Sequence, residues 1–161
     1  MNNKLTKELM TSPAIYWEEQ TPIKDVISLM KDNNIGFIPI TKNKILIGVV
    51  TDRDILIRGV GVYKLNTKIN KIMTNGEIYF VSPDTPVEEA AKKMAEHKIR
   101  RLVVLENGYV AGVLTTKNLL NEPTLLKYIT QTYIPTETIK NYSMYTNSNP
   151  HDSVKAADYP L

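Results

Sequence analysis

The chain has 161 residues, of which 42% are hydrophobic and 23% charged, proportions that are typical of a folded domain and exclude wholesale disorder. It has no cysteine and two histidines, which excludes disulfides, thiol catalysis, cysteine–zinc sites and a multi-histidine metal centre. A net charge of +3 is too small to indicate a nucleic-acid partner, and no apolar run approaches the roughly 20 residues of a membrane span. The N-terminal MNNKLTKELMTSP lacks the apolar core of a secretory signal, so we expect a cytoplasmic protein.

Residues 9–60 carry the pattern strand, helix, strand, strand, helix. The predicted elements are an apolar strand over 14–17, a helix from residue 21, strands over 36–41 and 45–50, and a short helix near 52–54. The longer helix begins at Thr21-Pro22, and the apolar residues of its inner face are Ile23, Val26, Ile27 and Met30. Lys42-Asn43-Lys44 is the predicted turn between the two central strands.

Residues 72–121 repeat this pattern. Met10-Thr11 recurs as Met73-Thr74, and Gly48-Val49-Val50-Thr51 recurs as Gly112-Val113-Leu114-Thr115. The predicted elements are a strand over 77–81, a helix from residue 85, strands over 101–105 and 109–114, and a short helix near 116–118. Thr85-Pro86-Val87-Glu88 has the form of a capping box, with Thr85 as the N-cap and Glu88 reaching back. Gly108 favours the hairpin turn of this unit because it tolerates a positive φ.

A linker over 61–71 separates the two units, and a C-terminal extension over 122–161 follows them. Four prolines interrupt the extension, which we expect to be partly helical, over 125–133, or mobile. A single β-α-β-β-α unit cannot cover both faces of its sheet. The sequence therefore predicts an α/β (α+β) fold of two tandem units, packed sheet to sheet with pseudo-two-fold symmetry.

The segment Gly48–Asp54, GVVTDRD, carries groups suited to a sugar and a phosphate. A carboxylate can accept hydrogen bonds from both vicinal hydroxyls of a ribose, and Asp54 stands where a strand gives way to a helix. The hydroxyl of Thr51 can reach the same sugar, and a helix N-terminus offers backbone N–H groups to a phosphate. Thr51 and Asp54 are equally suited to an ordinary helix N-terminus, so the segment alone leaves both interpretations open.

The Met-Thr start, the amphipathic helix and the strand that reaches Gly-x-x-Thr-x-x-Asp together resemble the CBS domain. The two units resemble a tandem CBS pair, or Bateman module, as found in stand-alone proteins. The resemblance implies a non-catalytic regulatory module without a cofactor, which signals the occupancy of its cleft to a partner. The ligands it implies contain adenosine: AMP, ADP, ATP, S-adenosylmethionine or cyclic di-AMP. It also implies a homodimer formed through the helices, with neither nucleic acid nor membrane as a partner.

The resemblance places one site between the two units. Ile78 and Ile99 would enclose the purine, while Arg100 and Arg101 would meet phosphates through charge-assisted hydrogen bonds. The full set of implied ligand-binding residues is Val49, Thr51, Asp54, Ile78, Tyr79, Ile99, Arg100 and Arg101. Val49 is equally suited to the core.

The mirror-related site departs from this pattern. Asn118 replaces the ribose carboxylate, and Gly36-Phe37 stand where the second unit has Arg100-Arg101, so we expect its phosphate contacts to be missing. The residues that remain for this second, weaker site are Ile15, Tyr16, Ile35, Thr115, Lys117 and Asn118. We expect one competent site and one weak or empty site.

A ligand-independent dimerisation scaffold is the alternative function. Apolar positions on the helices, such as Ile27 or Ala91, would then form an interface between copies of the chain. An enzyme ranks third, because the sequence shows no nucleophile–base pair, metal cluster or Walker-type loop.

Overall fold

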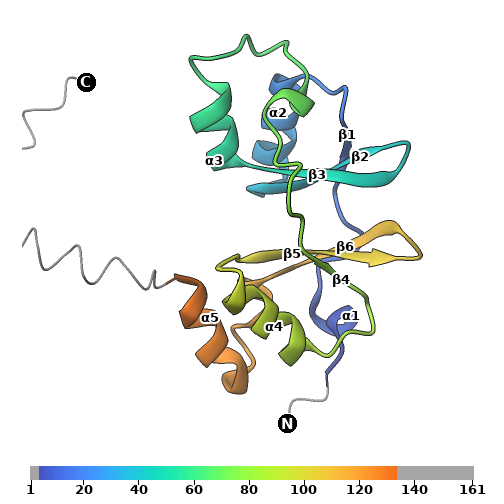
Figure 1. Cartoon of the computed structure of the whole chain (residues 1–161), viewed down its shortest axis with the longest axis vertical. Coiled ribbons are helices and arrows are strands. Elements are labelled where there is room, and N and C mark those ends of the chain that lie inside the picture. The colour runs from blue at the N-terminus through green and yellow to red at the C-terminus, as the bar shows by residue number, and fades with distance from the viewer. Residues whose placement is uncertain (1–3, 134–161) are drawn as a thin grey trace, which may run out of the picture.

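The computed structural model describes residues 4–133, which form two halves of the same design (Figure 1). The strands of the first half are β1 (Trp17–Glu18), β2 (Phe37–Lys42) and β3 (Ile45–Thr51), and those of the second are β4 (Phe80–Val81), β5 (Arg101–Glu106) and β6 (Tyr109–Thr115). The α-helices are α1 (Thr6–Leu9), α2 (Ile23–Asn33), α3 (Asp52–Asp54), α4 (Val87–Glu96) and α5 (Leu126–Tyr133). The remaining helical turns are a π-helical turn (Ile55–Gly59) and 3-10 turns (Ile69–Lys71, Thr116–Leu119 and Pro123–Leu125).

Each half is built on a three-stranded sheet. An antiparallel hairpin, β2–β3 or β5–β6, carries a short parallel strand, β1 or β4, at its outer edge. A single residue pair, Ile45 with Tyr109, joins β3 to β6 and gives the strand order β1-β2-β3-β6-β5-β4. In Figure 1 the two sheets lie between two helical layers, α2 and α3 on one side and α4 and α5 on the other. The predicted α/β fold of paired units is confirmed.

The two hairpin turns have the same backbone geometry although their sequences differ. Asn43 and Lys44 have φ of 50° and 67°, and Asn107 and Gly108 have φ of 51° and 84°. Two successive positive φ values define the type I′ turn, whose twist matches that of the flanking strands. Both predicted turns are therefore present.

The first strand of each unit is shorter than predicted and lies later in the chain. β1 and β4 pair with their neighbours over two residues each, instead of spanning 14–17 and 77–81. The preceding residues leave the sheet, and Ile15 and Ile78 line pockets between the two halves.

The predicted capping box at Thr85 is wrong. Pro86 occupies the N-cap position of α4, and no side chain caps this helix. The Thr85 hydroxyl instead accepts a hydrogen bond from the Ser82 amide at 3.1 Å, and Glu88 accepts one from the Tyr128 hydroxyl at 3.3 Å. The Thr85 carbonyl accepts a hydrogen bond from the Thr6 amide at 2.8 Å, which ties this turn to the N-terminal segment.

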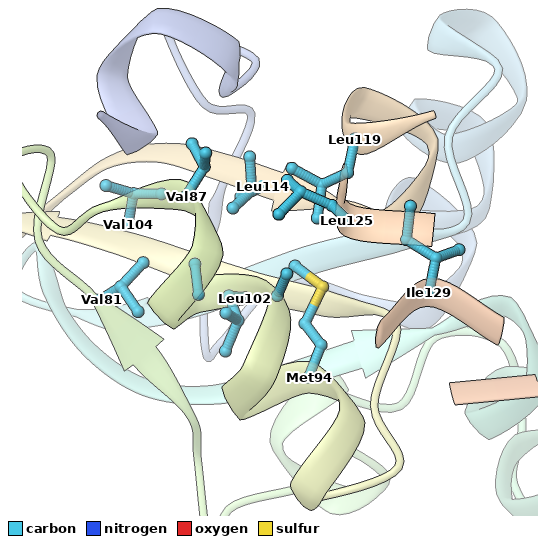
Figure 2. Close-up of a cluster of buried hydrophobic side chains, with 11 residues drawn as sticks. Val81, Val87, Met94, Leu102, Val104, Leu114, Leu119, Leu125 and Ile129 are labelled. Carbon is cyan, nitrogen blue, oxygen red and sulfur yellow. The ribbon is translucent and has the colours of Figure 1, made fainter. Parts of the chain in front are cut away.

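Each half has its own hydrophobic core. The first contains Ile23, Val26, Met30, Ile38, Ile40, Val50, Ile55, Ile69 and Ile72. The second contains Val81, Val87, Ala90, Ala91, Met94, Leu102, Val104, Leu114, Leu119, Leu125 and Ile129 (Figure 2). Ala91 is 1% exposed within this core, so it is not available for the interface that the scaffold alternative would form there. Ile27 packs against the first core.

The segments that open the two units cross over between the halves. Leu9 and Met10 pack against the second core, whereas Ile69, Ile72 and Met73 belong to or pack against the first. Isolated bridges from Thr11 to Val113 and from Thr74 to Val49 fix the two crossings. Each half is therefore completed by residues that precede the other half's strands.

The predicted helix over 125–133 is confirmed as a 3-10 turn followed by α5. Leu125 and Ile129 anchor this segment in the second core. Residues 134–161 of the extension lie outside the described residues. Within 4–133, no helix has the length and hydropathy required to cross a membrane.

Candidate functional site: two pockets between the halves

A first pocket of about 290 Å³ lies between the halves, and all eight residues predicted for the ligand line it. Thr51 and Asp54 come from the end of β3 and the start of α3, and Ile78 and Tyr79 from the segment before β4. The predicted residues that complete the lining are Val49, Ile99, Arg100 and Arg101. The lining also includes four residues that the sequence did not indicate: Phe37, Thr74, Glu77 and Lys98.

Thr51 and Asp54 form a reciprocal capping box. The Thr51 amide donates to Asp54 Oδ2 at 2.9 Å, and the Asp54 amide donates to Thr51 Oγ1 at 3.1 Å. The Asp54 side chain is 20% exposed and also lines the pocket. A carboxylate has about four lone-pair sites, so acceptor positions on Asp54 remain for a ligand. The helix-capping interpretation is confirmed, and it is compatible with binding.

Arg58 is a residue of this site that sequence reasoning missed. Its Nη2 donates to Asp54 Oδ1 at 2.5 Å and to Thr74 Oγ1 at 2.8 Å. The guanidinium therefore ties the carboxylate to the segment that opens the second unit. The i,i+4 spacing of Asp54 and Arg58 would have been the available signal, but the helix predicted near 52–54 did not extend to Arg58.

Tyr79 forms part of the opposite wall. Its ring stacks on His97, with centroids 3.9 Å apart and planes inclined by 27°. The Glu77 carboxylate, with which the Tyr79 hydroxyl hydrogen-bonds, raises the pKa of that hydroxyl above its ordinary value. Local sequence gives no sign of the stacking, because His97 lies beyond the end of α4.

A second pocket of about 650 Å³ lies at the mirror-related position. Five of the six residues predicted for it are in its lining, namely Ile15, Ile35, Thr115, Lys117 and Asn118, while Tyr16 is not. Asn118 Oδ1 accepts a hydrogen bond from the Thr115 amide at 2.8 Å, so the Asn118 side chain has the capping role that Asp54 has in the first half.

Arg100 and Arg101 line both pockets, which differs from the expectation that the second would lack phosphate contacts. The guanidinium carbon of Arg101 lies 5.8 Å from the ring centroid of Phe37, the residue at the corresponding position of the first half. The pseudo-two-fold arrangement thus brings Phe37 and Arg101, which occupy corresponding positions in the two halves, close together. As a result, Arg100 and Arg101 lie between the two pockets and line both. Arg100 stacks on Tyr133 of α5, at 5.3 Å from the ring centroid.

Within residues 4–133, no group of three or more His, Cys, Asp or Glu side chains could hold a metal ion.

Residues 7–61 and 69–124 each match the family model of the CBS domain. Two similar curated proteins come from Bacillus subtilis. The uncharacterized protein YlbB is 36% identical over 122 residues, which are 73% of this chain and 82% of that protein. The CBS domain-containing protein YhcV is 31% identical over 114 residues, which are 70% of this chain and 81% of that protein.

Solved structures share the fold. A CBS domain protein from Pyrobaculum aerophilum complexed with AMP superposes with a TM-score of 0.68 and 30% identity, over 79% of this chain and 98% of that chain. The CBS domain pair of protein MJ0100, in complex with 5′-methylthioadenosine and S-adenosyl-L-methionine, superposes with a TM-score of 0.65 and 25% identity. That match covers 73% of this chain and 98% of that chain.

Proposed function

The chain belongs to the CBS domain family and carries two of its domains in tandem, and from this premise we propose that it is a non-catalytic regulatory module. The module binds an adenosine-containing ligand in the first pocket, signals its occupancy to a partner and works in the cytoplasm. The convergence of Asp54 and Thr51 from one half with Ile78 and Ile99 from the other carries this proposal.

The chemistry of the first pocket suits an adenosine. Asp54 is held by Arg58 and the Thr51 amide and retains lone pairs for vicinal ribose hydroxyls. Apolar side chains from the second half offer a surface for a purine, and Arg100 and Arg101 offer charge-assisted hydrogen bonds to phosphates. The similar structures contain AMP, or 5′-methylthioadenosine with S-adenosyl-L-methionine, and adenosine is common to all three.

The test is a thermal-shift titration with AMP, ADP, ATP, S-adenosylmethionine, cyclic di-AMP and GTP. A ligand at a hundred times its dissociation constant stabilises the folded chain by about 2.7 kcal/mol, which raises the melting temperature by roughly 5–10 °C. We expect this shift with one or more adenosine ligands and not with GTP.

Asp54→Asn is the matched variant. Asn118 maintains the equivalent capping box in the second half, so Asp54→Asn should keep the fold while removing the ribose-binding carboxylate. We expect the shift to be lost in this variant and kept in Asp52→Ala, which removes a neighbouring carboxylate that lines neither pocket. A folded wild-type chain that responds to none of these ligands would refute the proposal.

The second candidate function is a homodimeric scaffold, which an exposed apolar segment favours. Large hydrophobic side chains that are 42–66% exposed cluster between α3 and the 3-10 turn at Ile69–Lys71: Leu56, Ile57, Val60, Val62, Tyr63 and Leu65. A second copy of the chain would cover them. Analytical ultracentrifugation should then give a dimer that Leu56→Asp dissociates and Lys64→Asp, within the same segment, does not. A monomer at all concentrations would exclude the scaffold.

A further inference from the structure

The second pocket differs from the first in the charge of its lining. Arg100, Arg101 and Lys117 line it, and none of its lining residues is Asp or Glu. The first pocket also has three basic residues, the two arginines and Lys98, but it contains Asp54 and Glu77 as well. Converging cations without a counter-charge in a concave site attract and concentrate anions.

The second pocket also lacks the group that would receive a ribose. Asn118 Oδ1 accepts hydrogen bonds from the Thr115 amide at 2.8 Å and the Thr115 hydroxyl at 2.7 Å, and an amide oxygen has two lone pairs. Its acceptor capacity is therefore used within the capping box. The second pocket therefore has basic side chains suited to an anion, but no free carboxylate corresponding to Asp54.

Tyr133 of α5 completes the pocket from outside the CBS domains, whose second match ends at residue 124. Its ring centroid lies 5.3 Å from the guanidinium carbon of Arg100, and its hydroxyl is 2.9 Å from Thr116 Oγ1. The Thr116 amide in turn donates to the Arg100 carbonyl at 3.0 Å. Tyr133 lines the second pocket and not the first, so its contact with Arg100, which lines both, lies on the side of the second pocket.

The position of α5 is fixed independently of Tyr133. Leu125 and Ile129 are buried in the second core, and Lys98 Nζ donates to the Gln131 carbonyl at 3.1 Å. The aromatic ring is therefore presented to Arg100 by a packed helix. A guanidinium held by a ring face keeps its N–H donors available at the ring's edge for an anion.

We infer that the second pocket is an anion site, completed by Tyr133, that takes a phosphate or diphosphate group without requiring a ribose. Arg100, Arg101 and Lys117 supply the charge-assisted hydrogen bonds, and Tyr133 is a positioning residue for Arg100. This site goes beyond the proposed function: it shares Arg100 and Arg101 with the first pocket, but Lys117 and Tyr133 line the second pocket alone.

Isothermal titration of the full chain with inorganic pyrophosphate, at constant ionic strength and without divalent cations, tests the inference. We expect wild type to bind one pyrophosphate per chain and Lys117→Ala to bind it about tenfold more weakly, as for a lost charge-assisted hydrogen bond. Tyr133→Leu should weaken binding about two- to fivefold, the range of an exposed cation–π contact, and Tyr133→Phe, which keeps the ring, by less. Both Lys117 and Tyr133 are exposed, so these variants should fold.

Two controls separate this site from its alternatives. Lys127→Ala removes a lysine of α5 that lines neither pocket, and should leave pyrophosphate binding unchanged. Asp54→Asn, which alters the first pocket, should not weaken pyrophosphate binding. A parallel titration with adenosine should show the opposite pattern, with binding lost in Asp54→Asn and kept in Lys117→Ala.

Absence of binding at millimolar pyrophosphate by folded wild type would overturn the inference. Equal losses in Lys117→Ala and Lys127→Ala, or retention of full affinity in both Lys117→Ala and Tyr133→Leu, would overturn it as well. Failure of the adenosine titration alone would refute the function proposed for the first pocket and leave the anion site standing.

Discussion

Asp54 and Asn118 show what the capping box requires and what it does not. Both residues accept a hydrogen bond from the backbone amide three positions earlier, at 2.9 and 2.8 Å, although only one carries a charge. The box needs an oxygen acceptor, which the sequence pattern predicts from Thr-x-x-Asp and Thr-x-x-Asn alike. The capping box does not need the negative charge of Asp54. The Asp54 carboxylate also accepts a hydrogen bond from Arg58 and lines the first pocket.

Sequence reasoning at this scale found most of the pocket residues that belong to the repeated motifs, but it missed Arg58 and placed Tyr16 in a pocket that it does not line. The resemblance to the CBS pair implied that Thr51 and Asp54 meet Ile78, and all three line one pocket. Tyr133 could not be placed, because its contact with Arg100 depends on how α5 packs and no repeated pattern describes that packing.

Gly48 is required by a close approach between the halves. A Cβ at this position would lie 2.6 Å from Met73 Sδ and 3.0 Å from the Thr74 carbonyl oxygen. The methionine can move, but the carbonyl belongs to the bridge between Val49 and Thr74. We predict that Gly48→Ala destabilises the chain by about 1–3 kcal/mol, as overpacking against a backbone atom does.

Urea denaturation of Gly48→Ala and Gly76→Ala measures this effect. A Cβ at Gly76 meets no atom within 4 Å, so this control should change the free energy of unfolding by less than about 0.5 kcal/mol. Equal effects of the two substitutions would show that the close approach has no energetic weight.

The two hairpins show how elements of similar shape are stabilised differently. Gly108 adopts its φ of 84° without strain, whereas Lys44 holds a φ of 67° that costs a residue with a side chain roughly 1–2 kcal/mol. The Glu18 carboxylate accepts hydrogen bonds from the Asn43 amide at 3.1 Å and the Lys44 amide at 3.2 Å. The sequence predicted the turn but not this clamp, since Glu18 reaches it only after β1 pairs with β2.

The clamp predicts a pH dependence. The Thr41 hydroxyl, together with the Lys44 and Asn43 amides, lowers the pKa of Glu18 below its ordinary value of 4.5. A lowered pKa in the folded state stabilises the fold above pH 4.5, and this contribution is lost as the pH falls through the folded-state pKa. Glu18→Gln should therefore lower stability at pH 7 and remove part of the loss that wild type shows on acidification.

Chemical denaturation at pH 7, 5 and 3.5 tests this prediction. Glu89→Gln changes an exposed glutamate of α4 and serves as the control. The difference in the free energy of unfolding between this variant and wild type should vary less with pH. If the free energies of unfolding of wild type and Glu18→Gln differed by the same amount at all three pH values, the hydrogen bonds from Glu18 to the turn would not depend on the ionised carboxylate.

At the scale of the whole molecule, the crossing segments make the halves interdependent. The Thr6 amide donates to the Thr85 carbonyl and the Ile69 amide to the Thr21 carbonyl, both at 2.8 Å, so each opening segment is bonded to the opposite half. Hydrophobic periodicity predicted the strands and helices of each unit, because these depend on neighbouring residues. The sequence repeat assigned residues 9–11 to the first unit. In the structure, Leu9 and Met10 pack against the second core.

This interdependence predicts one cooperative unfolding transition for residues 4–133. Ile72 and Leu102 are 1% and 0% exposed in the first and second cores, and truncating either to alanine should cost about 2–5 kcal/mol. Because neither half is complete without the other's opening segment, Ile72→Ala and Leu102→Ala should each lower the temperature of a single calorimetric peak, with equal calorimetric and van't Hoff enthalpies. Two peaks, with each variant moving only one of them, would mean that the cores unfold independently and that the crossing segments contribute little to stability.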